Sequence, residues 1–277
     1  MPLLLAQRET MRRRLRSAGK LFLAGVIPGL LMGGALMVQI YVIAKRRNYP
    51  VHGGLSRREV WASFKDGFLP LMTPLIILGG ILGGIFSPTE AAVAASAYAL
   101  FLGAVLYREI AGRDLFRILL DTVKTTSIVL FIISLAAIYG WLLAREQVPQ
   151  TVAKLMFSLT DDPRLALLII LVFLLVVGCF LETTAALIIL VPILVPAVMQ
   201  LGIDPVHFGL VMVLNLMIGL ITPPVGVVLY IVSDIARIPF EETVRATMPF
   251  LVPLLLVLLL VTFVPSLVLF LPNLLIP

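Results

Sequence analysis

The sequence predicts an all-α integral membrane protein, and three observations lead to this fold class. Hydrophobic residues make up 61% of the 277 residues and charged residues only 13%, against roughly 45–50% and about 25% in soluble domains. The mean hydropathy is +1.12. The apolar residues also form long continuous runs without the alternation of barrel strands. Because a bilayer leaves only helices or closed barrels as spanning structures, we expect a multi-pass helical protein.

Apolar runs near the length of a membrane-spanning helix, about 20 residues, follow one another along the chain. The runs, some of them broken, cover residues 21–44, 68–107, 125–144, 165–200, 206–235 and 247–272. The connecting segments mix charged and apolar residues. Two of these segments, 114–124 and 148–159, are predicted to form short amphipathic helices at the membrane interface.

The orientation of the first helix rests on the charges at its two ends. The loop at 45–66 holds six basic residues against two acidic ones, so the positive-inside rule places it in the cytoplasm. The leader at 1–20 is also rich in arginine and would favour the opposite orientation. We give more weight to the loop and therefore expect residues 45–66 to lie in the cytoplasm.

Three places interrupt the apolar helices, and irregular backbone at membrane depth is tolerated only where protein buries it or it lines a cavity. The first interruption covers residues 215–226 and contains Thr222-Pro223-Pro224. Two prolines lack N–H donors and disfavour helix in the residue before them, so free carbonyls are expected at 219–222. Unwound carbonyls of this kind coordinate cations such as sodium. An ordinary proline kink is the alternative interpretation.

The second interruption is Glu182-Thr183-Thr184, midway through the apolar run at 165–200. A carboxylate inside such a run indicates a functional site, because its burial in lipid is costly. The whole run is nearly twice as long as one helix needs to cross a core of about 30 Å. It therefore suits a re-entrant helical hairpin with the polar triplet at its tip. Two ordinary spans joined by a polar turn at the surface are the alternative.

The third interruption is Ser87-Pro88-Thr89-Glu90. Ser87 is predicted to cap the following helix, with Glu90 as the third helical residue of a capping box. Such a box is a complete structural explanation of the motif, so this break is predicted to be structural rather than a substrate contact.

No pattern in the sequence indicates an enzyme, a resident cofactor or a nucleic-acid-binding protein. There is no Walker A loop, GxGxxG or HExxH motif, and neither His52 nor His207 has a nucleophile or metal ligand at a recognisable spacing. The single cysteine, Cys179, excludes a disulfide framework and a CxxC metal site. The net charge of +6 comes from basic residues between apolar segments, which is typical of membrane topology. We therefore expect no catalytic residues.

Four stretches resemble the large membrane (permease) subunit of tripartite ATP-independent periplasmic (TRAP) transporters. They are GKLFLAGVIPGLL at 19–31, GGIFSPTEAAVAA at 83–95, GCFLETTAALIILVPILVPAVMQLGIDPVHFGLVMVLNLMIGLITPPVG at 178–226, and the late Pro249-Phe250. The resemblance runs from about residue 17 to the C-terminus, and the long third stretch is highly specific. It implies a sodium-driven symporter with an elevator mechanism, built from two inverted repeats that each carry a re-entrant hairpin.

The resemblance also implies partners and a site. The implied partners are a small membrane subunit, a periplasmic substrate-binding protein, an organic-acid anion (a C4-dicarboxylate, sialic acid or an oxo acid) and the lipid bilayer of the bacterial inner membrane, with no nucleic acid. Sodium is the implied coupling ion. The implied ion- and substrate-binding residues are Glu182, Thr183 and Thr184 on the hairpin and Asn215, Gly219, Thr222, Pro223, Pro224 and Gly226 on the broken helix, with sodium near Gly219 and Thr222.

By this resemblance the chain divides into six parts. They are a basic leader at 1–20, a scaffold-type transmembrane helix at 21–44, a cytoplasmic loop at 45–66, a 67–124 segment with a broken helix at 68–107, half of a transport domain at 125–246, and a C-terminal transmembrane helix at 247–277. The transport half holds the hairpin at 165–200 and the broken helix at 206–235.

Family members normally carry a first repeat before this region. We therefore expect the chain to be a fragment, a late-start gene model, or one half of a site completed by another chain. Two other functions stay open: another ion-coupled anion transporter of the same architecture that works without a binding protein, and a membrane remnant that does not transport.

Overall fold

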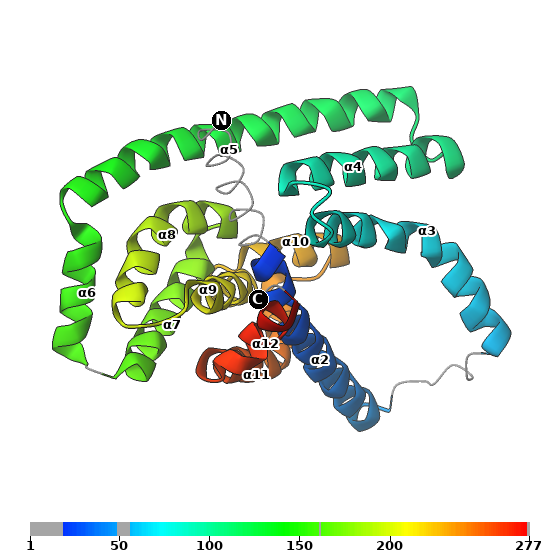
Figure 1. The fold of residues 1–277 in the computed structure, drawn as a ribbon. Helices are drawn as coiled ribbons and strands as arrows, with labels where there is room; N and C mark the ends of the chain where they lie inside the picture. The colour runs from blue at the N-terminus through cyan, green and yellow to red at the C-terminus, as the bar shows by residue number, and fades with distance from the viewer. Residues whose placement is uncertain (1–18, 49–55, 161, 276–277) are drawn as a thin grey trace, which may run out of the picture. The chain divides into compact units, whose positions relative to one another are not determined.

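The computed structural model describes residues 19–48, 56–160 and 162–275, and all regular structure in these ranges is helical (Figure 1). Seven of the described helices are long and apolar enough to cross a membrane. The predicted fold class, an all-α integral membrane protein with broken helices, is therefore confirmed. The predicted leader lies almost wholly outside the described residues, as does the middle of the 45–66 loop.

The helices form two compact units, which are described separately. In the first unit, residues 47–126, α3 (Arg57–Leu82) packs against α4 (Pro88–Phe101). The Tyr98 hydroxyl of α4 donates a hydrogen bond to the Leu69 carbonyl of α3 over 3.1 Å. A short π-helix, η1 (Leu102–Leu106), follows α4 directly. The predicted break in the 68–107 run is present, because α3 ends before Gly83 and α4 begins at Pro88.

The start of α4 confirms the predicted capping box. The Glu90 N–H donates to the Ser87 hydroxyl over 3.3 Å, and the Ser87 N–H donates to Glu90 Oε2 over 2.7 Å. Pro88 lies at the beginning of the helix. A backbone N–H at this position has no acceptor within the helix, so proline, which lacks the N–H, loses no hydrogen bond there. Together with Thr89 these residues account for the whole motif as a helix start.

Replacing Ser87 with alanine is expected to lower the stability of the protein by about 1 kcal/mol, because the Glu90 N–H loses the hydroxyl that caps it. Thermal unfolding of the purified protein in detergent measures the change. Ser96→Ala, at an exposed position inside the same helix, is the matched control and should not lower the melting temperature. Equal melting temperatures for Ser87→Ala and Ser96→Ala would contradict the assigned cap.

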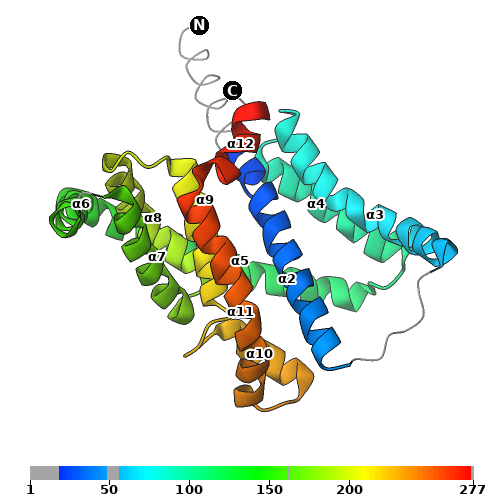
Figure 2. The same cartoon turned by 90° about the horizontal axis from the view of Figure 1, so that it is seen from below.

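The second unit, residues 23–46 and 127–275, holds the remaining helices (Figure 2). They are α2 (Val26–Arg46), the greater part of α5 (Gly112–Arg145), α6 (Val148–Leu159), α7 (Pro163–Phe180), α8 (Thr183–Gln200), α9 (Pro205–Gly219), α10 (Val227–Ala236), α11 (Phe240–Phe263) and α12 (Pro265–Leu275). One apolar cluster joins α7, α8 and α9, and a second joins α2, α7, α9, α11 and α12. Helices α7 and α9 belong to both clusters and are therefore the central helices of the unit.

A buried histidine fixes α9 against α11. His207 is 1% exposed, and its Nε2 lies 3.0 Å from the Val261 carbonyl oxygen. Pro265 cannot supply the N–H that would otherwise bond this carbonyl, so the His207 ring donates in its place. The ring thus satisfies a carbonyl at the junction between α11 and α12, which is a structural role.

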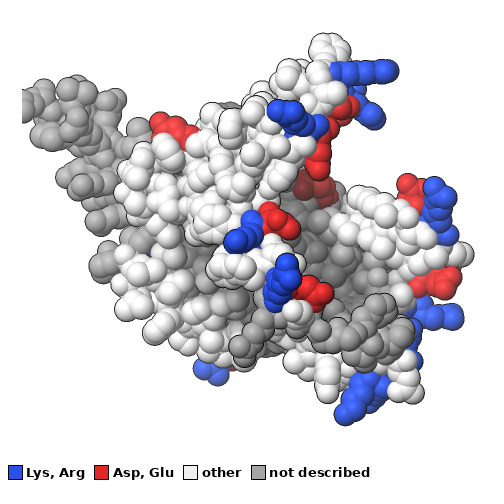
Figure 3. Space-filling view, turned by 90° about the vertical axis from the view of Figure 1, so that its right-hand side faces the viewer, with Lys and Arg blue, Asp and Glu red and all other residues white. Residues whose placement is uncertain are grey.

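Charged side chains are sparse on the molecular surface. In the face drawn in Figure 3, Lys, Arg, Asp and Glu form small separate groups with broad uncharged areas between them. This distribution suits a protein whose apolar surface faces lipid rather than water.

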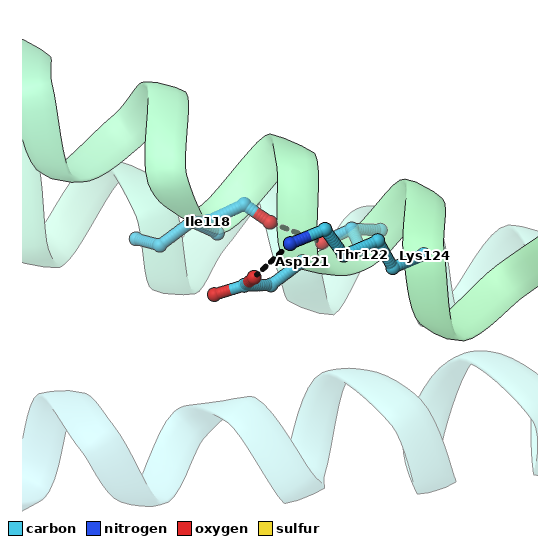
Figure 4. Close-up of polar contacts among 4 residues, drawn as sticks. All are labelled: Ile118, Asp121, Thr122 and Lys124. Carbon is cyan, nitrogen blue, oxygen red and sulfur yellow. Dashed lines mark hydrogen bonds and ion pairs between the residues drawn. The ribbon is translucent and has the colours of Figure 1, made fainter.

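The predicted amphipathic helix at 114–124 is wrong as a separate element. Helix α5 runs without interruption from Gly112 to Arg145, because the sequence offers no proline and no glycine from 113 to 139 to end it. Its first turns carry an exposed Asp121–Lys124 ion pair of 3.8 Å and a hydrogen bond from the Thr122 hydroxyl to the Ile118 carbonyl (Figure 4). The helix predicted at 148–159 is present as α6.

Two other boundaries differ from the prediction. Helix α3 begins at Arg57, well inside the predicted loop, because Ser56 and Glu59 form a second capping box. The predicted C-terminal span at 247–272 begins earlier, at Phe240, and is divided by Val264 into α11 and α12. Pro265 explains this division, since proline disfavours helix in the residue before it.

Candidate ion and substrate site

The junction between α7 and α8, at the tip of the predicted hairpin, contains the predicted polar triplet. Leu181 and Glu182 are extended, and α8 begins at Thr183. Glu182 is the N-cap of α8: its Oε2 accepts the Ala185 N–H over 3.0 Å, and its Oε1 accepts the Thr184 hydroxyl over 3.0 Å. The Glu182 carboxylate thus neutralises the positive end of α8 while remaining exposed.

Thr183 differs from its two polar neighbours. Its hydroxyl oxygen is buried and has no hydrogen-bond partner among the described residues. A buried hydroxyl without a partner is unfavourable by about 1–3 kcal/mol. The Thr183 hydroxyl is therefore free to bond a group outside the described residues.

The helix break between α9 and α10 is present where the sequence predicts it. Helix α9 ends at Gly219 and α10 begins at Val227, with a cis peptide bond between Pro223 and Pro224. Gly226 has a φ of +55°, a conformation that glycine adopts without the steric penalty of a side chain. An added Cβ at Gly226 would also meet the Thr222 carbonyl oxygen at 3.1 Å.

The prediction of free carbonyls at 219–222 is wrong for Gly219 and Leu220. The Gly219 carbonyl accepts the Thr222 N–H over 2.9 Å, and the Leu220 carbonyl accepts the Val228 N–H over 3.1 Å. These bonds form because the chain turns back on itself after α9 instead of unwinding. Among the backbone hydrogen bonds outside helices in the described part, none uses the Ile221 or Thr222 carbonyl as acceptor.

Thr222 presents a second oxygen at the same place. Its hydroxyl donates to the Ile218 carbonyl over 2.7 Å. Donation uses the hydrogen and leaves the lone pairs of the hydroxyl oxygen available. The hydroxyl can therefore act as a cation ligand without breaking its hydrogen bond.

A close crossing of α7 and α9 joins the two interruptions. An added Cβ on Gly219 would lie 2.6 Å from the Gly178 Cα, and one on Gly178 would lie 3.0 Å from the Leu216 carbonyl oxygen. Only glycine on both helices permits this approach. The end of α7, and with it the start of the hairpin junction, therefore lies directly against the end of α9.

Cys179 extends this contact to the prolines. Its carbonyl accepts the Gly226 N–H over 3.3 Å, and its thiol lies 3.6 Å from the Pro223 carbonyl oxygen. Sequence reasoning did not select Gly178 or Cys179 as site residues. In the sequence, Gly178 stands out only because it is a glycine three residues before the hairpin junction. Nothing in the sequence links it to Gly219.

Asn215 is fully buried, one turn before the end of α9. Its amide nitrogen donates to the Leu171 carbonyl of α7 over 2.7 Å, whereas its Oδ1 has no partner among the described residues. Of the predicted site residues, Asn215 and Thr183 thus each bring an unsatisfied buried oxygen to the packed region of α7, α8 and α9.

Apart from the Glu182 carboxylate, the oxygens of this region are uncharged. They are hydroxyl, amide and backbone carbonyl oxygens, which suit a hard cation such as sodium. Within the described ranges no group of three or more His, Cys, Asp or Glu side chains could hold a metal ion.

A pocket of about 490 Å³ lies beside the start of α8 and is lined by Ile132, Leu135, Tyr139, Ala185 and Ile189.

Comparison with known proteins identifies the family. Residues 14–267 match the family model described as tripartite ATP-independent periplasmic transporter, DctM component. The sialic acid TRAP transporter large permease protein of Vibrio cholerae is 49% identical over 258 residues, which are 93% of this chain and 60% of that protein. The C4-dicarboxylate TRAP transporter large permease protein of Pseudomonas aeruginosa is 43% identical over 93% of this chain and 60% of its own length.

A third relative carries a different substrate name. The 2,3-diketo-L-gulonate TRAP transporter large permease protein of Escherichia coli is 40% identical over 91% of this chain and 59% of its own length. The chain thus spans about three fifths of the length of each of these three relatives. These relatives are transport proteins, not enzymes. The chain belongs to the TRAP transporter family as a DctM component, a multi-pass large permease protein of the bacterial inner membrane.

Proposed function

We propose that the chain forms part of the large membrane subunit of a sodium-coupled importer of organic acids. In this proposal a small membrane subunit and a periplasmic substrate-binding protein complete the transporter. The relatives are named for sialic acid, 2,3-diketo-L-gulonate and C4-dicarboxylates. All three are carboxylate anions, so the proposed substrate of this chain belongs to the same chemical class.

The observation that carries the proposal is the crossing of Gly178 and Gly219, which holds the hairpin junction against the helix break. Sodium is proposed to bind near the Thr222 hydroxyl and the Ile221 and Thr222 carbonyls. The unsatisfied Asn215 and Thr183 oxygens are proposed to contribute to the same ion and substrate site. This placement keeps the predicted sodium position at Thr222 and moves it away from the Gly219 carbonyl.

The anionic substrate is proposed to bind in this region together with sodium. Helix N-terminal ends favour anions, but the Glu182 carboxylate already caps the N-terminus of α8. A substrate carboxylate at the same helix end would be repelled by the negative charge of Glu182. Sodium bound at the break offsets this repulsion, which gives a physical reason for coupling: the anion binds well only after the cation.

The depth of the break supports a re-entrant hairpin. The 15 residues of α9 span about 22 Å and the 10 residues of α10 about 15 Å. Neither helix alone crosses a core of about 30 Å, so in this proposal both enter the bilayer and the break lies inside it. Because the end of α7 contacts this break, the hairpin tip belongs at the same depth, as a re-entrant element requires. In the proposed elevator mechanism, the 125–246 half moves with this site.

A chimera tests the proposal. Residues 14–267 replace the matching part of the Vibrio cholerae sialic acid permease, which is produced with its own partner proteins. We expect sodium-dependent uptake of sialic acid that disappears when the binding protein is omitted. Uptake without the binding protein would favour another type of anion transporter. A chimera that reaches the membrane intact but takes up no sialic acid in any cation would favour a remnant without transport activity.

A further inference from the structure

The first turns of α3 carry an exposed row of aromatic side chains. Trp61, Phe64 and Phe68 are all exposed, with Trp61 at 59%. The Trp61 and Phe64 rings stack with centroids 5.8 Å apart, and the Phe64 and Phe68 rings lie 5.9 Å apart. At about 100° per residue these three side chains occupy one narrow side of the helix.

Two basic residues with described side chains lie beside the aromatic row. Arg58 and Lys65 are both exposed, and they fall about 40–60° from Trp61 around the helix. The Lys65 Nζ lies 5.9 Å from the centre of the Trp61 ring, a cation–π distance. Glu59 and Asp66 fall about 140–160° away from Trp61 around the helix. The start of α3 is therefore a surface with basic and aromatic residues on one side and acidic residues on the other.

The length of α3 sets the depth of this surface. Its 26 residues span about 39 Å, whereas the hydrocarbon core measures about 30 Å. About six residues must therefore extend beyond the core if the helix crosses it. The apolar end at Leu82 carries no charge, so the charged turns at the other end are the part that extends. Among the seven candidate spans, the one at Arg58–Leu82 also has the lowest mean hydropathy, 1.4.

Capping fixes where this surface begins. The Ser56 N–H donates to Glu59 Oε2 over 2.8 Å, and the Arg58 N–H donates to the Ser56 hydroxyl over 3.2 Å. The capping box also engages Glu59 on the far side of the helix. As a result, Arg58 and Lys65 have no acidic neighbour on their own side in this helix, and their charges are available to an external anion.

We propose that the first three turns of α3 bind anionic phospholipid headgroups, with Trp61, Phe64 and Phe68 inserted at the interface and Arg58 and Lys65 contacting phosphate. Tryptophan is enriched at this depth because its ring is amphipathic. Basic residues near a membrane surface attract anionic lipid. The proposal concerns lipid recognition by the first unit and is independent of the ion and substrate site.

The chain holds two tryptophans, Trp61 and Trp141, so Trp141→Phe leaves Trp61 as the sole fluorophore. The purified full chain is reconstituted in vesicles that contain lipids brominated either near the headgroup or near the chain end. We expect stronger quenching of Trp61 by the shallow bromines. Absence of quenching by either lipid would mean that protein covers Trp61, and stronger quenching by the deep bromines would place it in the core; each result overturns the proposal.

The preference for anionic lipid is measured in the Trp141→Phe protein by energy transfer from Trp61 to dansyl-labelled phosphatidylglycerol or phosphatidylcholine. We expect a preference of several-fold for phosphatidylglycerol that is lost in Arg58→Gln/Lys65→Gln. Arg113→Gln/Arg117→Gln, on exposed positions of α5, removes the same net charge and should keep the preference. An unchanged preference in Arg58→Gln/Lys65→Gln, or an equal loss in both double variants, would overturn the proposal.

Discussion

Gly219→Ala is expected to destabilise the protein more than any other single methyl addition considered. The new Cβ would lie 2.6 Å from both the Cα and the carbonyl carbon of Gly178, and backbone atoms cannot rotate away as a side chain can. Helices α7 and α9 must separate, which disturbs the apolar cluster that joins α7, α8 and α9. Overpacking of this kind lowers stability by about 3 kcal/mol, even though alanine favours helix over glycine.

Thermal unfolding in detergent and the yield of folded protein measure this effect. Gly33→Ala is the matched control, because Gly33 lies inside α2 and an added Cβ there has no neighbour within 4 Å. It should raise the stability by up to about 1 kcal/mol. Gly178→Ala should fall between the two, since its closest contact is longer, 3.0 Å. Equal melting temperatures for Gly219→Ala and Gly33→Ala would show that the crossing is not close.

Asn215→Leu is expected to abolish transport while leaving the protein as stable as before, or more stable. The buried Oδ1 has no partner, and its removal relieves an unfavourable term of about 1–3 kcal/mol. Loss of the hydrogen bond to the Leu171 carbonyl lowers the free energy of unfolding by less than this, because that carbonyl lies inside the continuous helix α7. Leucine has a similar size and keeps the site packed.

Uptake by the chimera and thermal unfolding of the same protein test this prediction together. We expect at least a tenfold loss of uptake with an unchanged or higher melting temperature. Gln200→Leu, which replaces an exposed amide side chain at the end of α8, controls for the exchange of an amide for leucine and should retain uptake. A parallel fall of stability and uptake in Asn215→Leu would instead assign Asn215 a purely structural role.

Local chemistry explains which parts of the fold could be predicted from the sequence. The breaks at Glu182 and at Thr222-Pro223-Pro224 were predictable, because polar triplets and paired prolines end helices wherever they lie. The Ser87 cap was predictable for the same reason. Ser56 and Glu59 carry an identical spacing that could have predicted the start of α3. The continuity of α5 could also have been predicted from the lack of breakers between 113 and 139.

The arrangement of the site could not be predicted in this way. The contact between Gly178 and Gly219 joins residues 41 positions apart, and its formation depends on the packing of three helices. The use of the Gly219 and Leu220 carbonyls depends on the turn that follows α9, which two prolines alone do not specify. The sequence therefore predicts the residues of the site better than the partners of their oxygen atoms.

The sodium dependence of uptake in Thr222→Val tests most directly whether the helix break forms the sodium site. Thr122→Val is a closely matched control, since the Thr122 hydroxyl also donates to an isoleucine carbonyl four residues earlier, over the same 2.7 Å (Figure 4). In the chimera we expect Thr222→Val to raise the sodium concentration for half-maximal uptake about tenfold, equivalent to about 1.4 kcal/mol. Thr122→Val should leave it unchanged. An unaltered sodium dependence in Thr222→Val, or an equal shift in both variants, would contradict a sodium site at Thr222.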